Sequence, residues 1–198
     1  LRPSNPVMTT FDDAVLRAMQ KWPDVPSCTG WLGLDRRGRW ILKDQPITHD
    51  RFIQFLNRNY TGDQNGRWFV QNGPQRVFVD LAAAPFAIRL ASDGSLVTHS
   101  GVTIQRLAGV IASDQGNLYL TSEIGLGLLI DRDLARFIDQ LHDTGGHRCE
   151  DRFERFILGD PGAMPLRLRW RHDEVLVRLG CEAALPAEFG FVRRPRGC

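Results

Sequence analysis

Side chains that could bind a metal are densest between His142 and Asp151, a segment that holds two imidazoles, one thiol and several carboxylates. A glycine pair in its middle gives the backbone the freedom to fold back, so His142, His147 and Cys149 can converge on zinc. The spacing H-x4-H-x-C matches no familiar zinc motif, and a helix end followed by a charged loop explains it as well. We therefore expect no cofactor, and we name these three residues as the metal ligands to test.

Nucleophilic catalysis has one superficial candidate, the adjacent pair His99 and Ser100. Adjacency in sequence does not make a catalytic dyad, and the strand-turn-helix elbow that exposes a reactive serine is missing around Ser100. Asp131 and Asp133 fit the start of a helix, where the helix dipole favours carboxylates. The sequence therefore predicts no catalytic residue, and an enzyme of unknown class stays as the alternative to a binding protein.

An amide-rich turn separates two of the clearest strand patterns, at 67–71 and 76–80, which are rich in aromatic and β-branched residues. Its glycine and proline are typical turn residues, and its amides can satisfy turn backbone groups. The alternative is a polar recognition site on one edge of the hairpin. The residues of that candidate ligand site are Trp68, Gln71, Asn72, Gln75 and Arg76.

Positive charge is carried almost entirely by arginine, with 23 arginines among 25 basic residues and a net charge of only +2. Local clusters occur at Arg36, Arg37, Arg39 and Lys43, at Arg167, Arg169 and Arg171, and at Arg193, Arg194 and Arg196. Arginine-bearing hairpins beside Trp40, Trp68 and Trp170 could bind nucleic acid through phosphate contacts and base stacking. Alternation along 166–171 instead places Trp170 on an apolar face, which favours burial and disfavours a nucleic-acid partner.

Composition and length bound the class of protein. The chain has 198 residues, of which 42% are hydrophobic and 24% charged, as in an ordinary folded protein. Its four cysteines are far apart, which predicts reduced thiols, and no apolar run approaches the roughly 20 residues that cross a bilayer. We expect a cytoplasmic protein without a membrane partner, and the sequence leaves its oligomeric state open.

Periodicity predicts an α+β fold that is rich in β structure. Helices are expected at about 11–22, at 49–60 with Thr48 as its cap, at 131–142 and at 153–158. Glycine-marked reversals separate the expected strands, which we arrange as antiparallel hairpins or a meander. These strands are expected at 31–34, 39–42, 67–71, 76–80, 86–90, 96–98, 104–112, 117–122, 124–130, 166–170 and 175–179.

We divide the chain into two packed lobes, an N-terminal α+β lobe at 8–90 and a β-rich lobe at 91–198 with one or two helices. A loose internal echo links Gly38-Arg39-Trp40-Ile41 with Gly94-Ser95-Leu96-Val97, and the segment 63–69 with 114–119. The two spacings are 56 and 51 residues. Because a duplication requires one fixed period, we favour hairpin composition as the explanation of the echo, and a true duplication is the alternative.

The order of several short motifs resembles an uncharacterised bacterial family, a domain of unknown function, over roughly residues 31–142. The motifs are Gly38-Arg39-Trp40, Pro46-Ile47, Gly66-Arg67-Trp68-Phe69-Val70, Arg76-Val77-Phe78-Val79 and Ala84-Pro85-Phe86, followed by Leu118-Tyr119-Leu120 and Leu128-Leu129-Ile130-Asp131-Arg132. The resemblance implies a fold and no activity, and it leaves the tail after His142 outside. We therefore expect a non-catalytic binding or interaction module whose partner is a protein or a small molecule.

Overall fold

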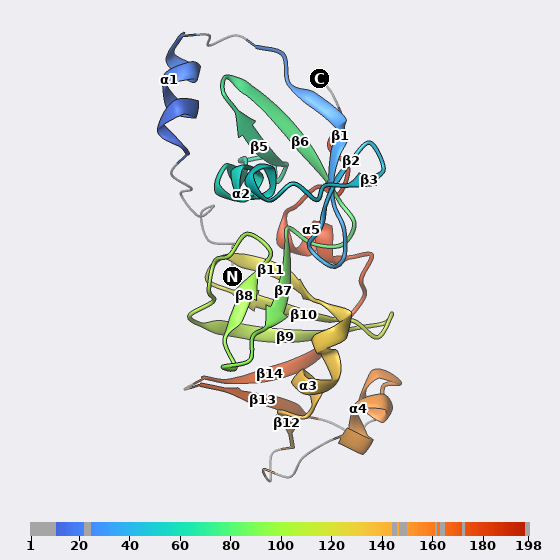
Figure 1. The fold of residues 1–198 in the computed structure, drawn as a ribbon. Coiled ribbons are helices and arrows are strands. Elements are labelled where there is room, and N and C mark those ends of the chain that lie inside the picture. Colours follow the sequence, from blue (N-terminus) through green and yellow to red (C-terminus); the bar gives the residue numbers. More distant parts are fainter. Residues whose placement is uncertain are drawn as a thin grey trace.

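The computed structural model describes residues 11–21, 25–143, 146, 150–160, 162, 165–171 and 173–196. Two mixed β-sheets, accompanied by short helices, lie one above the other along the length of the molecule (Figure 1). The predicted α+β, strand-rich class is confirmed. Among the described residues there are five α-helices and one 3-10 helix, slightly more than the three or four expected.

Sheet A is built from the first part of the chain and has the strand order β3-β2-β1-β6-β5-β4. Its strands are β1 (Cys28–Leu34), β2 (Trp40–Leu42), β3 (Gln45–Pro46), β4 (Tyr60–Gly62), β5 (Trp68–Asn72) and β6 (Gln75–Leu81). Helix α1 (Asp13–Lys21) precedes the sheet, and α2 (Asp50–Arg58) connects β3 to β4. Strands β1 and β6, the first and last, pair in parallel at the centre.

Sheet B follows and has the order β12-β13-β14-β9-β10-β11-β7-β8. Its strands are β7 (Phe86–Leu90), β8 (Leu96–Thr98), β9 (Leu107–Ser113), β10 (Leu118–Ser122), β11 (Gly125–Leu129), β12 (Leu141–His142), β13 (Leu166–Trp170) and β14 (Asp173–Gly180). Its helices are η1 (Asp131–Asp133), α3 (Leu134–Ile138) and α4 (Glu150–Ile157). The last helix, α5 (Leu185–Phe189), lies between the sheets, and the chain then returns to sheet A (Figure 1).

The two sheets contain the same six-stranded topology. In sheet A, three strands, a helix and three more strands place the first strand parallel to the sixth. Strands β9 to β14 repeat this arrangement, with β9 parallel to β14 and with η1 and α3 at the position of α2. Strands β7 and β8 extend the second unit at the β11 edge. The chain is therefore an internal structural duplication, in which the second unit carries α4 as an insertion.

Strand register supports this equivalence. Leu34 is paired with Trp40 on one side and with Leu81 on the other. Ala112 and Leu118, which pair in the second unit, stand 78 positions after Leu34 and Trp40, and Leu179 stands 98 positions after Leu81. The internal echo read from the sequence was wrong in its alignment, because the turn at Gly94 belongs to the β7–β8 hairpin outside the repeat. The sequence comparison aligned hairpin turns that are not equivalent in the fold, because glycine adopts the same positive-φ conformation in several turns.

Two other sequence expectations need correction. Thr48 does not cap α2. The N-cap residue is His49, whose Nδ1 accepts a hydrogen bond from the backbone N–H of Phe52 at 3.3 Å. The helix expected at 131–142 is shorter, because it ends at Ile138 and the chain then forms β12 at the sheet edge. The predicted antiparallel hairpins are present, and each unit additionally closes on a parallel pair that joins strands far apart in sequence.

Aromatic rings fill the junction between the sheets. His99, which follows β8, lies with its ring centroid 5.5 Å from that of Trp40 and 5.4 Å from that of Tyr60. The Tyr60 hydroxyl donates to the carbonyl of Pro85 at 2.8 Å, and Asn57 of α2 donates to the carbonyl of His99 at 3.3 Å. The two sheets therefore share one apolar core that continues from one unit into the other.

The β1–β2 hairpin reaches sheet B through Gly38. Its φ is +79°, and a Cβ atom there would stand 2.7 Å from Cβ of His99 and 3.1 Å from Cβ of Ala87. Real Cβ atoms do not approach each other so closely, so the junction requires a residue without a side chain. Glycine at this turn thus serves both the backbone conformation and the contact between the sheets.

We expect Gly38→Ala to destabilise the protein more than Gly94→Ala. Gly94 occupies an equivalent hairpin turn, with φ +80°, but a Cβ atom there meets nothing within 4 Å. Both substitutions should cost about 1 kcal/mol for the positive φ. Only Gly38→Ala should lose a further 1–3 kcal/mol, roughly, because the added methyl group overpacks the junction. Urea unfolding of both variants measures the difference, and equal losses would contradict the contact role of Gly38.

Candidate functional site

The tip of the β1–β2 hairpin is fixed by one carboxylate. Oδ1 of Asp35 accepts hydrogen bonds from the backbone N–H groups of Arg37 and Arg39 at 2.9 and 2.8 Å, and Oδ2 accepts from Nε of Arg39 at 2.6 Å. Asp63 and Arg67 make the same set of contacts in the β4–β5 turn. The Asp-x-x-Gly-Arg pattern therefore stabilises both turns. In the β1–β2 hairpin it also fixes the position of the arginines at the tip.

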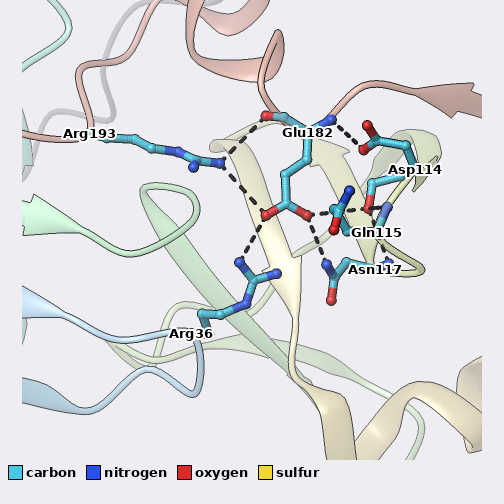
Figure 2. Close-up of polar contacts among 7 residues, drawn as sticks. Arg36, Asp114, Gln115, Asn117, Glu182 and Arg193 are labelled. Atoms are coloured by element: carbon cyan, nitrogen blue, oxygen red, sulfur yellow. Dashed lines mark hydrogen bonds and ion pairs between the residues drawn. The ribbon is translucent and has the colours of Figure 1, made fainter.

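Arg36 extends from this tip to a carboxylate of the second unit. Its Nη1 lies 2.9 Å from Oε1 of Glu182, a residue that is only 8% exposed and follows β14 (Figure 2). Arg193, from the returning C-terminal segment, approaches the same oxygen at 3.8 Å. The other oxygen accepts from Nδ2 of Asn117 at 2.8 Å and from Oγ of Ser113 at 3.3 Å. We call these five residues the Glu182 cluster.

The Glu182 cluster joins elements that are far apart in the chain. Burial alone raises the pKa of Glu182, but the hydrogen bonds from Arg36 and Asn117 and the charge of Arg36 outweigh it, so the pKa of Glu182 is lowered. The phenol of Tyr119 lies beside the carboxylate, and burial raises the pKa of Tyr119 above its ordinary value. A lowered pKa keeps the Glu182 carboxylate ionised near neutral pH, which suits a structural connection to Arg36.

A pocket of about 560 Å³ opens on the other side of the hairpin tip. Four arginines line it, together with a histidine and an aspartate, and they come from the hairpin, from β7, from the loop after β8 and from η1. These residues are Arg37, Arg39, Arg89, His99, Asp131 and Arg132. We call it the arginine pocket, and both structural units contribute to its walls.

The four guanidinium groups differ in how far they are satisfied. Arg37 donates from Nε and Nη2 to Oδ2 of Asp131, at 3.1 and 2.5 Å. Arg39 uses Nε for the turn, and Arg132 has only a 3.9 Å approach to a carboxylate oxygen of Asp133. Arg89 is exposed and makes no ion pair with any residue that the structure describes. The pocket therefore retains unused donors.

His99 forms part of the pocket floor. Its Nδ1 accepts a hydrogen bond from the backbone N–H of Ala87 at 3.4 Å, which places the proton of the neutral ring on Nε2. Nε2 is buried and has no hydrogen-bond partner among the described residues. Burial lowers the pKa of His99 to about 3, so the ring is neutral at physiological pH.

This arrangement is suited to binding an anion. Guanidinium groups present several donors in a planar fork that matches carboxylate and phosphate oxygens. The pocket is less suited to proton transfer, because a general base works best with a pKa near the operating pH. The pKa of His99 is far below that range, and the hydrogen bond from Arg37 lowers the pKa of Asp131 as well.

The amide residues proposed from the sequence lie elsewhere, in the β5–β6 hairpin. Nε2 of Gln71 donates to the carbonyl of Gly73 at 2.8 Å, and Nε2 of Gln75 donates to the carbonyl of Pro26 at 3.1 Å. The guanidinium of Arg76 lies over the ring of Phe69 at 4.8 Å. Gln71 thus binds a backbone carbonyl of its own turn, whereas Gln75 binds a carbonyl of the segment before β1.

The other two members of that set have different surroundings. Trp68 packs against Tyr60 and Phe86, with ring centroids 4.9 and 5.0 Å apart, at the opposite end of β5. Asn72 is exposed and lines a small apolar hollow of about 220 Å³ beside Trp31 and Phe52. A ligand-binding role for the five residues stays a prediction, and the geometry gives us no reason to build on it.

Of the three metal ligands proposed from the sequence, the structure describes one, His142. His142 is buried in β12, with Nε2 3.0 Å from Oε1 of Glu174, whereas His147 and Cys149 lie outside the described residues. Within the described ranges, no three histidine, cysteine, aspartate or glutamate side chains gather in a way that could hold a metal ion. Cys28 and Cys181 are free thiols, as expected.

Base stacking would require exposed tryptophans, and two of the three candidates are buried. Trp170 is 2% exposed and Trp40 is 1% exposed, while Trp68 belongs to the aromatic junction. The expectation that Trp170 occupies an apolar face is confirmed. In the part of the chain that the structure describes, no helix is long and apolar enough to cross a membrane.

Two of the four arginines that line the arginine pocket, Arg37 and Arg39, were identified from the sequence as part of a basic cluster at a hairpin tip. The sequence did not connect this cluster with Arg89, His99 or Arg132. No local signal joins them, because they are 52 to 95 residues from Arg37. Two hints were present: Arg89 interrupts an otherwise buried strand, and Arg132 follows Asp131 directly at the start of η1.

The model of a known protein family matches almost the whole chain. The model of the family described as "Protein of unknown function (DUF2946)" matches residues 11–196. The resemblance to an uncharacterised family is confirmed, and it extends beyond residues 31–142 to include the tail, whose strands complete the second unit. No curated protein matches the chain at a significant level.

Two solved structures are similar to this chain. A DUF1285 family protein from Silicibacter pomeroyi DSS-3 is 17% identical, with coverage of 60% of this chain and 74% of that chain and a TM-score of 0.44. A DUF1285 family protein from Shewanella baltica OS155 is 18% identical, with coverage of 58% and 91% and a TM-score of 0.42. At these scores we draw no inference about function from either.

We expect Glu182→Gln to lower the free energy of unfolding by about 1–3 kcal/mol, because Arg36 and Arg193 then lose the charge that they bind. The matched control is Glu188→Gln, which breaks an exposed pair with Arg178 and should cost less than about 1 kcal/mol. Urea unfolding at neutral pH measures both. Equal losses in the two variants would show that the Glu182 cluster does not fasten the hairpin tip.

Stability should fall as the pH drops below the ordinary histidine value of 6.5, because His99 takes up a proton only after unfolding. The loss should reach at most about 1.4 kcal/mol per pH unit and continue until the pH nears the lowered value of about 3. Unfolding curves between about pH 7 and about pH 5 test this. His99→Gln should flatten the slope, and an unchanged slope would contradict a neutral His99 whose Nε2 is shielded from solvent.

Proposed function

We propose that this chain, which belongs to the DUF2946 family of proteins of unknown function, is a non-catalytic binding module for a small anionic ligand. The ligand site in this proposal is the arginine pocket, and the protein acts in the bacterial cytoplasm. The observation that carries the proposal is a pocket of about 560 Å³ lined by four arginines, one of which, Arg89, has no acidic partner among the described residues.

The size and composition of the pocket support a small molecule. Ligand pockets in proteins typically enclose about 300–1,000 Å³, so a volume of about 560 Å³ has room for more than a single inorganic ion. An exposed guanidinium group without a carboxylate partner is only weakly hydrated for a cation, and an anion with two or more oxygens can replace its water with paired hydrogen bonds. Arg89 therefore provides the anchor that we expect a ligand to use.

The duplication supplies an internal comparison. The hairpin tip of the second unit has the same turn geometry, with Ser113 in place of Asp35 and Gly116 in place of Gly38. At the positions of Arg37 and Arg39, however, the second unit has Gln115 and Asn117. Since the fold builds the same turn without these positive charges, the turn does not require Arg37. This difference favours a role for Arg37 that goes beyond the structure of the turn.

The chemistry of the pocket favours binding over catalysis. Among the described residues that line it, the one histidine is neutral and has a pKa of about 3, and the one carboxylate is engaged by Arg37. Neither group is poised to accept and release a proton near neutral pH. An enzyme that uses the pocket would need another acid or base from its substrate, so the binding module is the simpler proposal.

We expect inorganic pyrophosphate to bind to the protein with a single-site isotherm in calorimetric titration at low salt. Arg89→Gln should weaken this binding by about tenfold or more, because an unpaired, charge-assisted hydrogen-bond donor is lost. The matched control is Arg51→Gln, an exposed arginine on α2 that does not line the pocket. It should leave the affinity unchanged.

Two results would contradict the proposal. The first is an absence of pyrophosphate binding to the wild-type protein. The second is a loss of affinity in Arg51→Gln as large as that in Arg89→Gln, which would indicate unspecific attraction to surface charge. A parallel titration with single-stranded oligonucleotide tests the nucleic-acid alternative. Tighter binding of the oligonucleotide than of pyrophosphate, with a steep salt dependence, would favour that alternative.

A further inference from the structure

We propose that the ligand of the arginine pocket carries a phosphate group, and that Asp131 occupies part of the phosphate position on Arg37 in the free protein. This inference rests on the proposed function, and it adds the chemical class of the ligand and a competitor within the chain. It depends on three observations: the geometry of the Arg37–Asp131 contact, its exposure to solvent, and the number of unused donors around it.

Asp131 contacts Arg37 in the way that a bound anion would. One oxygen, Oδ2, accepts from both Nε and Nη2 of Arg37, at 3.1 and 2.5 Å. This edge of the guanidinium group is a donor pair that phosphate oxygens also accept from. The other oxygen of Asp131 accepts from the backbone N–H of Arg132 at 2.9 Å, so the carboxylate is held by its own turn. Asp131 can thus release Arg37 without becoming unbonded.

The contact is exposed and therefore easily exchanged. The side chain of Arg37 is 62% exposed and that of Asp131 is 59% exposed. Ion pairs at such a surface contribute little to stability, because water competes for both partners and salt screens their attraction. The neighbouring carboxylates are not free in the same way, since Asp35 holds the hairpin turn and the buried Asp133 accepts from the backbone N–H of Leu90 at 2.9 Å. Asp131 is the carboxylate that a ligand can displace.

The unused donors favour phosphate over a carboxylate ligand. The guanidinium group of Arg39 donates from Nε only, and that of Arg132 lies no closer than 3.9 Å to the carboxylate of Asp133. The guanidinium group of Arg89 makes no ion pair with the described residues. A carboxylate has only two oxygens, and a single guanidinium fork already engages both of them. A phosphate group has three terminal oxygens and can accept from several arginines at once. The number of donors at this site matches the second kind of ligand.

Charge adds to the argument. The four arginines face three nearby carboxylates, Asp35, Asp131 and Asp133, so the free pocket has a small positive excess. A dianion that enters beside Asp131 must overcome repulsion from that carboxylate. Replacing it by the isosteric amide removes the repulsion and also frees Arg37 for the ligand. The acceptor for the backbone N–H of Arg132 is kept, because asparagine retains a side-chain carbonyl.

The test compares wild-type protein, Asp131→Asn and Asp139→Asn in calorimetric titrations with inorganic pyrophosphate and with malonate. Asp139 is an exposed aspartate at the end of α3 that does not line the pocket, so its substitution controls for a change in net charge. We expect Asp131→Asn to tighten pyrophosphate binding by about three- to tenfold, and Asp139→Asn to change it by less than about twofold. Malonate, which carries two carboxylates, should bind more weakly than pyrophosphate to all three proteins.

Each outcome decides a separate point. If no protein binds either anion, the proposed function fails together with this inference. If the wild-type protein binds pyrophosphate and Asp131→Asn binds it equally or less tightly, the pocket binds anions but Asp131 is no competitor. If malonate binds as tightly as pyrophosphate, the phosphate class is wrong. Thermal unfolding of Asp131→Asn verifies that the exposed substitution leaves the fold intact.

Discussion

The contact between the β1–β2 hairpin tip and the second unit is the constraint on which the other features depend. Gly38 allows the tip to lie directly against His99 and Ala87, where a side chain would collide with them. Arg36 reaches Glu182 from the same tip. Because these contacts fix where the hairpin lies on sheet B, they also place Arg37 beside Asp131 and form one wall of the arginine pocket.

Duplication explains how such a junction arises. Each unit closes a six-stranded sheet by pairing its first and last strands in parallel, and each presents a hairpin tip stabilised by a side-chain acceptor and a glycine. Both tips meet near Glu182, one through Arg36 and the other through Ser113 and Asn117 (Figure 2). Their differences separate residues that the turn needs from residues that it does not. Only the first tip carries arginines that face an open pocket.

Local chemistry was read correctly where the interactions are local. The hairpins around Gly38, Gly73 and Gly94 formed as predicted, because the turn residues set their own register. The amphipathic strand that buries Trp170 also formed as predicted. The internal echo failed for the same reason, since it compared turns, and similar turns occur in hairpins that are not equivalent in the fold.

The sequence by itself determined the strand-rich class, the hairpin turns and the basic character of the tip at Arg37. Those properties depend on residues a few positions apart, whose conformations and charges act without the remainder of the chain. The tertiary structure decided the parallel pairs, the duplication and the arginine pocket. These depend on contacts such as that between Arg37 and Asp131, which are 94 positions apart in the chain and belong to different structural units.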